Sequence, residues 1–136
     1  MKAFQLQQYD KKNLALNCVD LPRPQVAPNE VLIEVKAAGV NPLDNMITRG
    51  DVKMITPYAL PQTMGNECAG LIVEVGSEVS DFAVGDAVFS RLPISRPGAF
   101  AEYVAVPADA VARMPEGLSF EEAASIPLTA LTAYQA

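Results

Sequence analysis

The stretch from Gly65 to Phe89 constrains the fold more than any other part of this chain, because its local signals agree on paired strands. Hydrophobic residues recur at every second position over 71–75, the spacing of a strand with one buried face. Gly76 interrupts the pattern, and Gly85-Asp86 provides turn chemistry directly before a second apolar run at 87–89. The stretch therefore predicts a strand, a turn and a returning strand.

The same alternation predicts further strands on both sides of that stretch. They are expected as a hairpin of 4–6 with 14–18, a strand over 31–38, a strand over 100–106 that is buried on both faces, and a short strand over 110–112. Cys18 and Cys68 lie within such apolar patterns, so we expect both to be small buried residues.

Helical signals are confined to two regions. The first is a short helix over 42–49, with Asn41 as its N-cap, Asp44 in its first turn and Gly50 closing it. The second begins at Ser119, where a capping box precedes a helix that Pro127 ends before starting another. Many short strands with few helices predict a mainly β fold, best described as a compact, partly open β-barrel.

Composition limits the classes of function. The 136 residues are half hydrophobic and carry a net charge of −6 with scattered basic residues, which favours one globular domain and disfavours nucleic-acid or membrane partners. There is no histidine and there are only two cysteines, too few ligands for a structural zinc site. With no signal peptide pattern, we expect a cytoplasmic protein.

Candidate functional side chains are polar residues at element ends. Asn41 is either a helix cap or a ligand contact, and local sequence favours the cap. Asn66 and Glu67 precede the central strand, where a strand-entry turn is the simpler interpretation, with Glu67 solvated or paired with a basic residue. The irregular loop over 51–64 and the loop over 91–98 are expected to line a cleft.

No nucleotide-phosphate motif and no histidine-based triad occurs in the chain. Tyr58 and Tyr103 are potential proton donors, although packing roles are more common for tyrosines in such positions. We therefore assign no catalytic residue, and any chemistry would depend on a cofactor held mainly elsewhere.

Several ordered motifs together resemble the medium-chain dehydrogenase/reductase superfamily, in particular its zinc-independent quinone oxidoreductase branch. They are Ala38-Gly39-Val40-Asn41-Pro42-Leu43-Asp44, Gly65-Asn66-Glu67-Cys68-Ala69-Gly70, Val84-Gly85-Asp86, Gly98-Ala99-Phe100-Ala101-Glu102-Tyr103 and Ala123-Ala124-Ser125-Ile126-Pro127-Leu128-Thr129-Ala130-Leu131-Thr132-Ala133-Tyr134. The resemblance implies a GroES-like catalytic domain over residues 1–118. Residues 119–136 would begin the helices that lead to a Rossmann domain absent from this sequence, and Ala136 would lie inside an unfinished helix.

The resemblance also implies a site. Zinc-dependent relatives have a cysteine ligand at the position of Asn41 and a histidine ligand at that of Asn66, so two carboxamides point away from zinc. In metal-free relatives the residue matching Asn41 lies beside the nicotinamide, and the threonine matching Thr129 approaches the cofactor. Asp44 and Glu67 match acidic positions near the metal of the zinc enzymes, and Met46 replaces a tyrosine common among quinone oxidoreductases.

The function expected from the resemblance is hydride transfer from NADPH to quinones, enones or related activated carbonyl compounds, without zinc. NADPH would be bound mostly by the missing domain, the substrate would be a small molecule, and the full-length protein would be a homodimer, with this part alone inactive. Two alternatives stay open: a relative of zinc-type alcohol dehydrogenases, and a free-standing GroES-like interaction module without activity.

Overall fold

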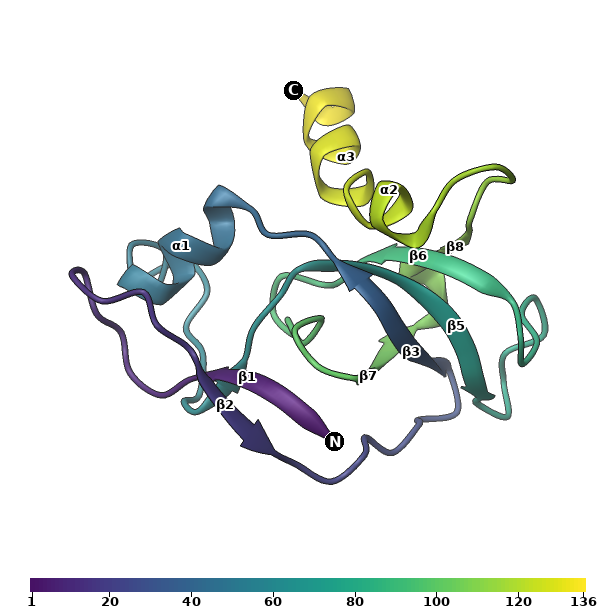
Figure 1. Ribbon diagram of the computed structural model, residues 1–136, viewed down its shortest axis with the longest axis horizontal. Coiled ribbons are helices and arrows are strands. Elements are labelled where there is room, and N and C mark those ends of the chain that lie inside the picture. The colour runs from purple at the N-terminus through teal and green to yellow at the C-terminus, as the bar shows by residue number, and fades with distance from the viewer.

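The computed structural model describes all residues from Met1 to Ala136 and is built mainly from short antiparallel strands (Figure 1). In chain order the elements are β1 (Lys2–Leu6), β2 (Asn17–Asp20), β3 (Glu30–Ala38), α1 (Pro42–Arg49), β4 (Gln62–Thr63), β5 (Glu67–Val75), β6 (Ala87–Arg91), β7 (Tyr103–Pro107), the 3-10 helix η1 (Ala108–Ala110), β8 (Val111–Arg113), α2 (Phe120–Ala124) and α3 (Pro127–Gln135). The predicted mainly β fold with short helices is confirmed.

Two antiparallel sheets make up the body, with strand orders β2-β1-β4 and β7-β3-β5-β6-β8. Strand β3 pairs with β5 and β7, and β5 occupies the middle position of the larger sheet. The sheets are joined where Ala3 pairs with Ala101 and the Phe4 N–H donates to the Phe100 carbonyl at 2.8 Å. This junction makes the body a partly open barrel.

The main core fills the space beside the larger sheet. It consists of Val31, Ile33, Cys68, Ile72, Val88, Leu92, Ala99, Val104 and Val106, all buried. Cys68 is buried as predicted, and burial raises the pKa of its thiol to about 12, which keeps it unreactive. The expectation for Cys18 was wrong: it is exposed on the edge strand β2, where it pairs with Phe4, whose side chain is also exposed.

Several strand bounds differ from those expected from periodicity. The hairpin partner of β1 begins at Asn17, because the register pairs Phe4 with Cys18 and leaves Leu14 outside the sheet. The predicted strand over 100–106 starts only at Tyr103, although Val104, Ala105 and Val106 are all buried as expected for a strand covered on both faces. The strand predicted over 71–75 begins earlier, at Glu67.

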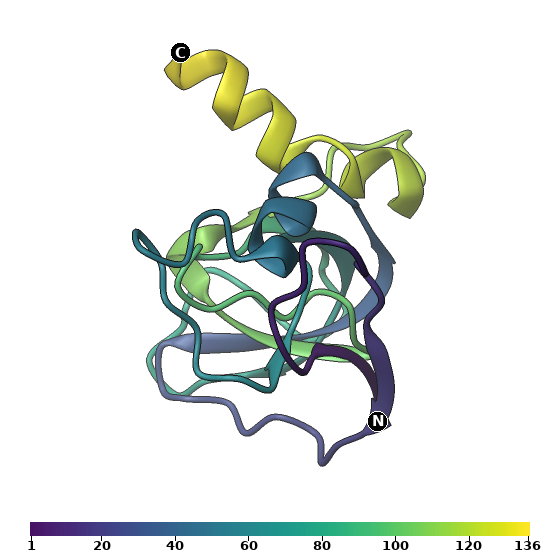
Figure 2. The same ribbon diagram turned by 90° about the vertical axis from the view of Figure 1, so that its left-hand side faces the viewer.

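Two helices follow the barrel. Ser119 caps α2, accepting from the Glu122 N–H at 3.2 Å, and Ala123 and Ala124 bury that helix against Ala69 of β5. From there α3 projects away from the barrel (Figure 2), with Pro127 as its buried residue. With nine residues, α3 is far shorter than a membrane crossing requires, and no other helix meets that requirement.

Candidate functional site

Four polar side chains meet below the surface where α1 adjoins β5. Asn41 and Asp44 belong to the start of α1, and Asn66 and Glu67 to the start of β5. Their exposed fractions are 6%, 4%, 1% and 1% respectively. We refer to these four residues as the carboxamide–carboxylate cluster. Burying these polar groups costs free energy unless they are hydrogen-bonded, so the partners of each one matter.

Asn41 is the predicted helix cap, and its side chain also contacts β5. It is the N-cap of α1, in extended conformation (φ −122°, ψ 158°), and its N–H donates to Asp44 Oδ2 at 2.7 Å in a capping box. Its side-chain Nδ2 donates to Glu67 Oε1 at 2.7 Å. The predicted cap is therefore confirmed, and the amide group is turned toward β5.

Asp44 and Asn66 form the second buried pair of the cluster. Asn66 Nδ2 donates to Asp44 Oδ1 at 2.8 Å, while Asn66 Oδ1 has no hydrogen-bond partner although it is fully buried. Burial raises the pKa of Asp44, and the nearby charge of Glu67 acts in the same direction against the hydrogen bonds that Asp44 accepts. The unpartnered amide oxygen is an acceptor without a donor.

Glu67 was expected to be solvated or paired with a basic residue, and this expectation was wrong. Arg91 is its cross-strand neighbour, yet no ion pair joins them. Instead the carboxylate accepts from Asn41 Nδ2 at Oε1 and from the Leu128 N–H at Oε2, both at 2.7 Å. Both donors come from element ends, which always carry unused N–H groups or polar caps.

Thr129, the second residue expected at a cofactor, follows Leu128 in the first turn of α3 and is exposed. Its hydroxyl donates to the carbonyls of Ser125 at 2.8 Å and Ile126 at 3.2 Å. Asn41 and Thr129 make no direct contact, but Glu67 joins the segments that carry them. Sequence reasoning missed this role of Glu67, because nothing local to β5 reveals that a distant helix begins there.

The two tyrosines that could donate protons both have other interactions. The Tyr58 hydroxyl donates to the Ile94 carbonyl at 2.5 Å and so joins the loops over 51–64 and 91–98. Burial raises the pKa of Tyr58. Tyr103 lies under the guanidinium of Arg23, 4.4 Å from the ring centroid, which is a packing contact.

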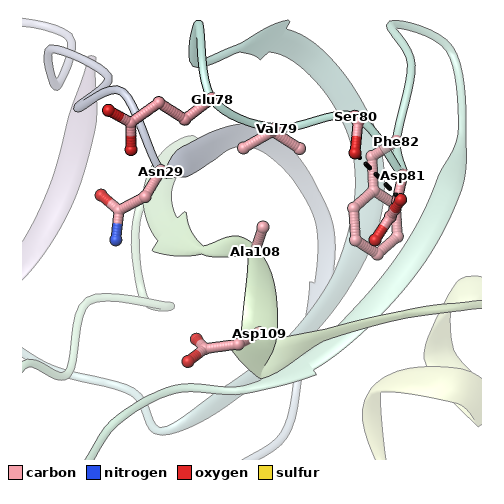
Figure 3. A pocket seen from close by; sticks show the side chains of 8 residues that line it. All are labelled: Asn29, Glu78, Val79, Ser80, Asp81, Phe82, Ala108 and Asp109. Carbon is pink, nitrogen blue, oxygen red and sulfur yellow. Dashed lines mark hydrogen bonds between the residues drawn. The ribbon is translucent and has the colours of Figure 1, made fainter.

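The segment expected as an irregular loop over 51–64 contains the short strand β4, which pairs with β1. This segment and the 91–98 loop contribute to a pocket of about 230 Å³, through Gln62 and Thr63 of β4 and through Arg96, Pro97 and Gly98. A larger, acidic pocket of about 350 Å³ lies between the 78–82 segment and η1 (Figure 3), where Glu78, Asp81 and Asp109 supply carboxylates. No residue of the carboxamide–carboxylate cluster lines either pocket.

The donors of the cluster suit hydrogen bonding better than metal binding. No three histidine, cysteine or acidic side chains are placed to hold a metal ion. Two of the four cluster residues are carboxamides, and the carboxylates of Asp44 and Glu67 already accept short hydrogen bonds. Neutral amides are poor ligands for zinc compared with thiolate and imidazole. The absence of zinc stays a prediction.

The fold and the four-residue cluster define a GroES-like barrel of the alcohol dehydrogenase type. Residues 27–116 match the alcohol dehydrogenase GroES-like domain family, and the chain belongs to that family within the medium-chain dehydrogenase/reductase superfamily. The predicted GroES-like fold is thereby confirmed. The boundary expected between residues 118 and 119 stays a prediction.

Within this superfamily the chain is similar to quinone oxidoreductases. The chloroplastic quinone-oxidoreductase homolog of Spinacia oleracea is 35% identical over 136 residues, which are 100% of this chain and 41% of that protein. The quinone oxidoreductase of Coxiella burnetii has a TM-score of 0.87 at 36% identity, covering 99% of this chain and 43% of that one. The Escherichia coli quinone oxidoreductase complexed with NADPH has a TM-score of 0.86 at 31% identity, covering 98% and 39%.

This chain thus spans about two fifths of the length of these relatives. The similarity supports an oxidoreductase of the superfamily.

Proposed function

We propose that this chain is the catalytic domain of an NADPH-dependent, zinc-free oxidoreductase that transfers hydride to quinones, enones or related activated carbonyl compounds. The similarity to quinone oxidoreductases supports the reaction class. The observation that carries the proposal is the pair of carboxamides, Asn41 and Asn66, at the cluster. They make that position a hydrogen-bonding site, which favours a neutral organic group over a metal ion.

The carboxamide of a nicotinamide complements the unpaired acceptor of the cluster. It offers N–H groups, and Asn66 Oδ1 is a buried acceptor that has no donor. When bound, the reduced nicotinamide supplies the hydride, and the protein contributes binding and orientation. We propose that Asn41 and Thr129 contact the cofactor, whose phosphates are held by a second domain.

The remaining features of the whole protein follow from the same proposal. The substrate is a small molecule, the protein is a cytoplasmic homodimer, and neither nucleic acid nor membrane is a partner. The scattered basic residues and the net charge of −6 support the last point. No protein group is assigned as proton donor, and water is the proposed source of the proton.

Replacement of Asn41 by alanine in the full-length protein tests the proposal. We expect kcat/KM for NADPH in quinone reduction to fall about tenfold or more, because a cofactor contact is lost. The matched control is Ser119→Ala, which removes the side-chain cap of α2 and no residue assigned to the cofactor. If Asn41→Ala lowers only the melting temperature, as Ser119→Ala should, Asn41 is a cap and the proposed contact is wrong.

A further inference from the structure

We propose that Glu67 is a positioning residue that sets the relative placement of Asn41 and the first turn of α3, where Thr129 lies. This inference rests on the proposed function, because it concerns the two residues assigned to the cofactor. We call the pair of hydrogen bonds from Asn41 Nδ2 and the Leu128 N–H to the Glu67 carboxylate the Glu67 bridge.

The geometry of the Glu67 bridge uses the whole carboxylate. One oxygen accepts from the Asn41 amide and the other from the Leu128 N–H, each at 2.7 Å. The side chain is 1% exposed, so water cannot replace either donor without rearrangement. Charged acceptors form the shorter and stronger hydrogen bonds of proteins, and they are favourable at a helix N-terminus, where the N–H groups carry partial positive charge.

The bridge is also the principal polar tie between α3 and the barrel. Pro127 is the only buried residue of α3, and the residues after it are increasingly exposed. Helix α3 projects from the barrel with little packing to fix its direction (Figure 2). A buried carboxylate at its first turn therefore determines where that turn sits relative to Asn41.

Gly39 keeps the space that the bridge requires. A β-carbon at position 39 would lie 2.3 Å from Glu67 Oε1 and 2.8 Å from its carboxyl carbon. The Gly39 N–H also donates to the Glu67 carbonyl at 3.3 Å, which keeps the two backbones together. Any side chain at position 39 would have to displace the carboxylate while leaving its charge intact.

Three variants of the full-length protein test the role of Glu67 through the ratio of kcat to KM and through melting temperature. In Glu67→Gln the new amide N–H₂ group faces either Asn41 Nδ2 or the Leu128 N–H. Both of these are donors, so one hydrogen bond of the bridge breaks. Asn41→Asp places two carboxylates together. In the double variant the glutamine can donate to the aspartate and still accept from Leu128, which restores both hydrogen bonds.

We expect Glu67→Gln to lower kcat/KM for NADPH roughly 10- to 100-fold, because small misplacements of orienting groups are costly. Gly39→Ala should produce a loss of the same kind without removing the carboxylate. The matched control is Glu122→Gln, which alters an exposed carboxylate capping α2 and should leave kcat/KM within about twofold. The double variant should recover most of the melting temperature lost by the two single variants.

The outcomes separate this inference from the proposed function. If Glu67→Gln changes melting temperature but neither kcat nor KM, Glu67 is structural only and the inference is wrong. If the double variant melts no higher than the single variants, the Glu67 bridge does not exist as described. If the parent protein consumes no NADPH with any quinone or enone, the proposed function fails, while recovery of stability in the double variant would still establish the bridge.

Discussion

At the scale of single residues, Asp44 is a buried carboxyl group without a cation. It is 4% exposed, no cation pairs with it, and burial raises its pKa above the ordinary value of 3.8. Within the window between that value and the raised pKa, the folded protein holds a proton that the unfolded chain has released. The contribution of Asp44 to the free energy of unfolding therefore falls as pH rises through the window.

Replacement of Asp44 by asparagine should remove this dependence. An asparagine can still accept from the Asn41 N–H, and its amide can donate to Asn66 Oδ1 if that side chain flips. We expect the stability of Asp44→Asn relative to the parent to improve as pH rises from below 3.8 toward neutrality. Urea unfolding at a series of pH values measures this, and a relative stability that falls with rising pH would contradict the account.

Glu30 behaves in the opposite way. Burial acts to raise its pKa, but hydrogen bonds from the Arg96 guanidinium and the Ala27 N–H, with the charge of Arg96, hold that pKa below 4.5. The stability that ionised Glu30 contributes is present above its unfolded pKa and is lost as pH falls through the folded value.

Arg96→Met should therefore cost about 1 to 2 kcal/mol at neutral pH, because a buried carboxylate loses its cation. The cost should shrink as pH falls below 4.5. Lys36→Met is the control, since its partner Glu34 is about as exposed as Lys36 and such surface pairs contribute about 1 kcal/mol or less. Equal losses for the two variants in chemical denaturation would show that Glu30 does not depend on Arg96.

At this scale, the sequence could predict a residue's role where the interacting residues are close in sequence. The cap at Asn41 was predictable, because the proline and acidic residue that follow it act within one helical turn. The burial of Glu67 was not, since its partners Asn41 and Leu128 are distant in sequence and meet it only in the folded barrel.

At the scale of elements, two glycines with nearly the same φ distinguish the cost of backbone strain from the cost of a steric clash. Gly65 has φ +98° and Gly85 has φ +96°, so a side chain at either position adopts an unfavourable conformation. A β-carbon at position 65 would lie 2.6 Å from the backbone N of Phe100, whereas nothing lies within 4 Å of one at position 85. The Gly65 carbonyl also accepts from the N–H groups of Gly98 and Ala99.

Gly65→Ala should thus destabilise the protein by roughly 3 kcal/mol or more, and Gly85→Ala by roughly 1 to 2 kcal/mol. Thermal or chemical unfolding of the pair gives the comparison, in which Gly85→Ala is the control for conformational strain alone. If the two variants lose similar free energies of unfolding, Phe100 does not lie close enough to Gly65 to clash with a β-carbon there.

Strand pairing explains where element prediction succeeded and failed. The returning strand after Gly85-Asp86 was predicted and is β6, because turn chemistry and alternation lie in the same short stretch. The early start of β5 was not, because Glu67 and Cys68 join the strand through pairing with Arg91 and Ser90 rather than through alternation. Exposure of Cys18 likewise follows from the position of β2 at a sheet edge.

At the scale of the whole molecule, the barrel holds four buried polar side chains at its junction with α1 and α3. The family was predictable, because the order and spacing of its motifs are visible in the sequence. Contacts between residues that are distant in sequence are not. The cofactor contacts of Asn41 and Thr129 stay predictions, because this chain spans only about two fifths of its quinone oxidoreductase relatives.

The most direct test is turnover of the full-length protein without metal. The protein is treated with a strong chelator and assayed for zinc content, NADPH consumption and quinone reduction. Our account predicts no stoichiometric zinc and unchanged NADPH-dependent turnover after chelation. Stoichiometric zinc whose removal abolishes turnover, and whose return restores it, would contradict the assignment of the two carboxamides to a metal-free hydride-transfer site.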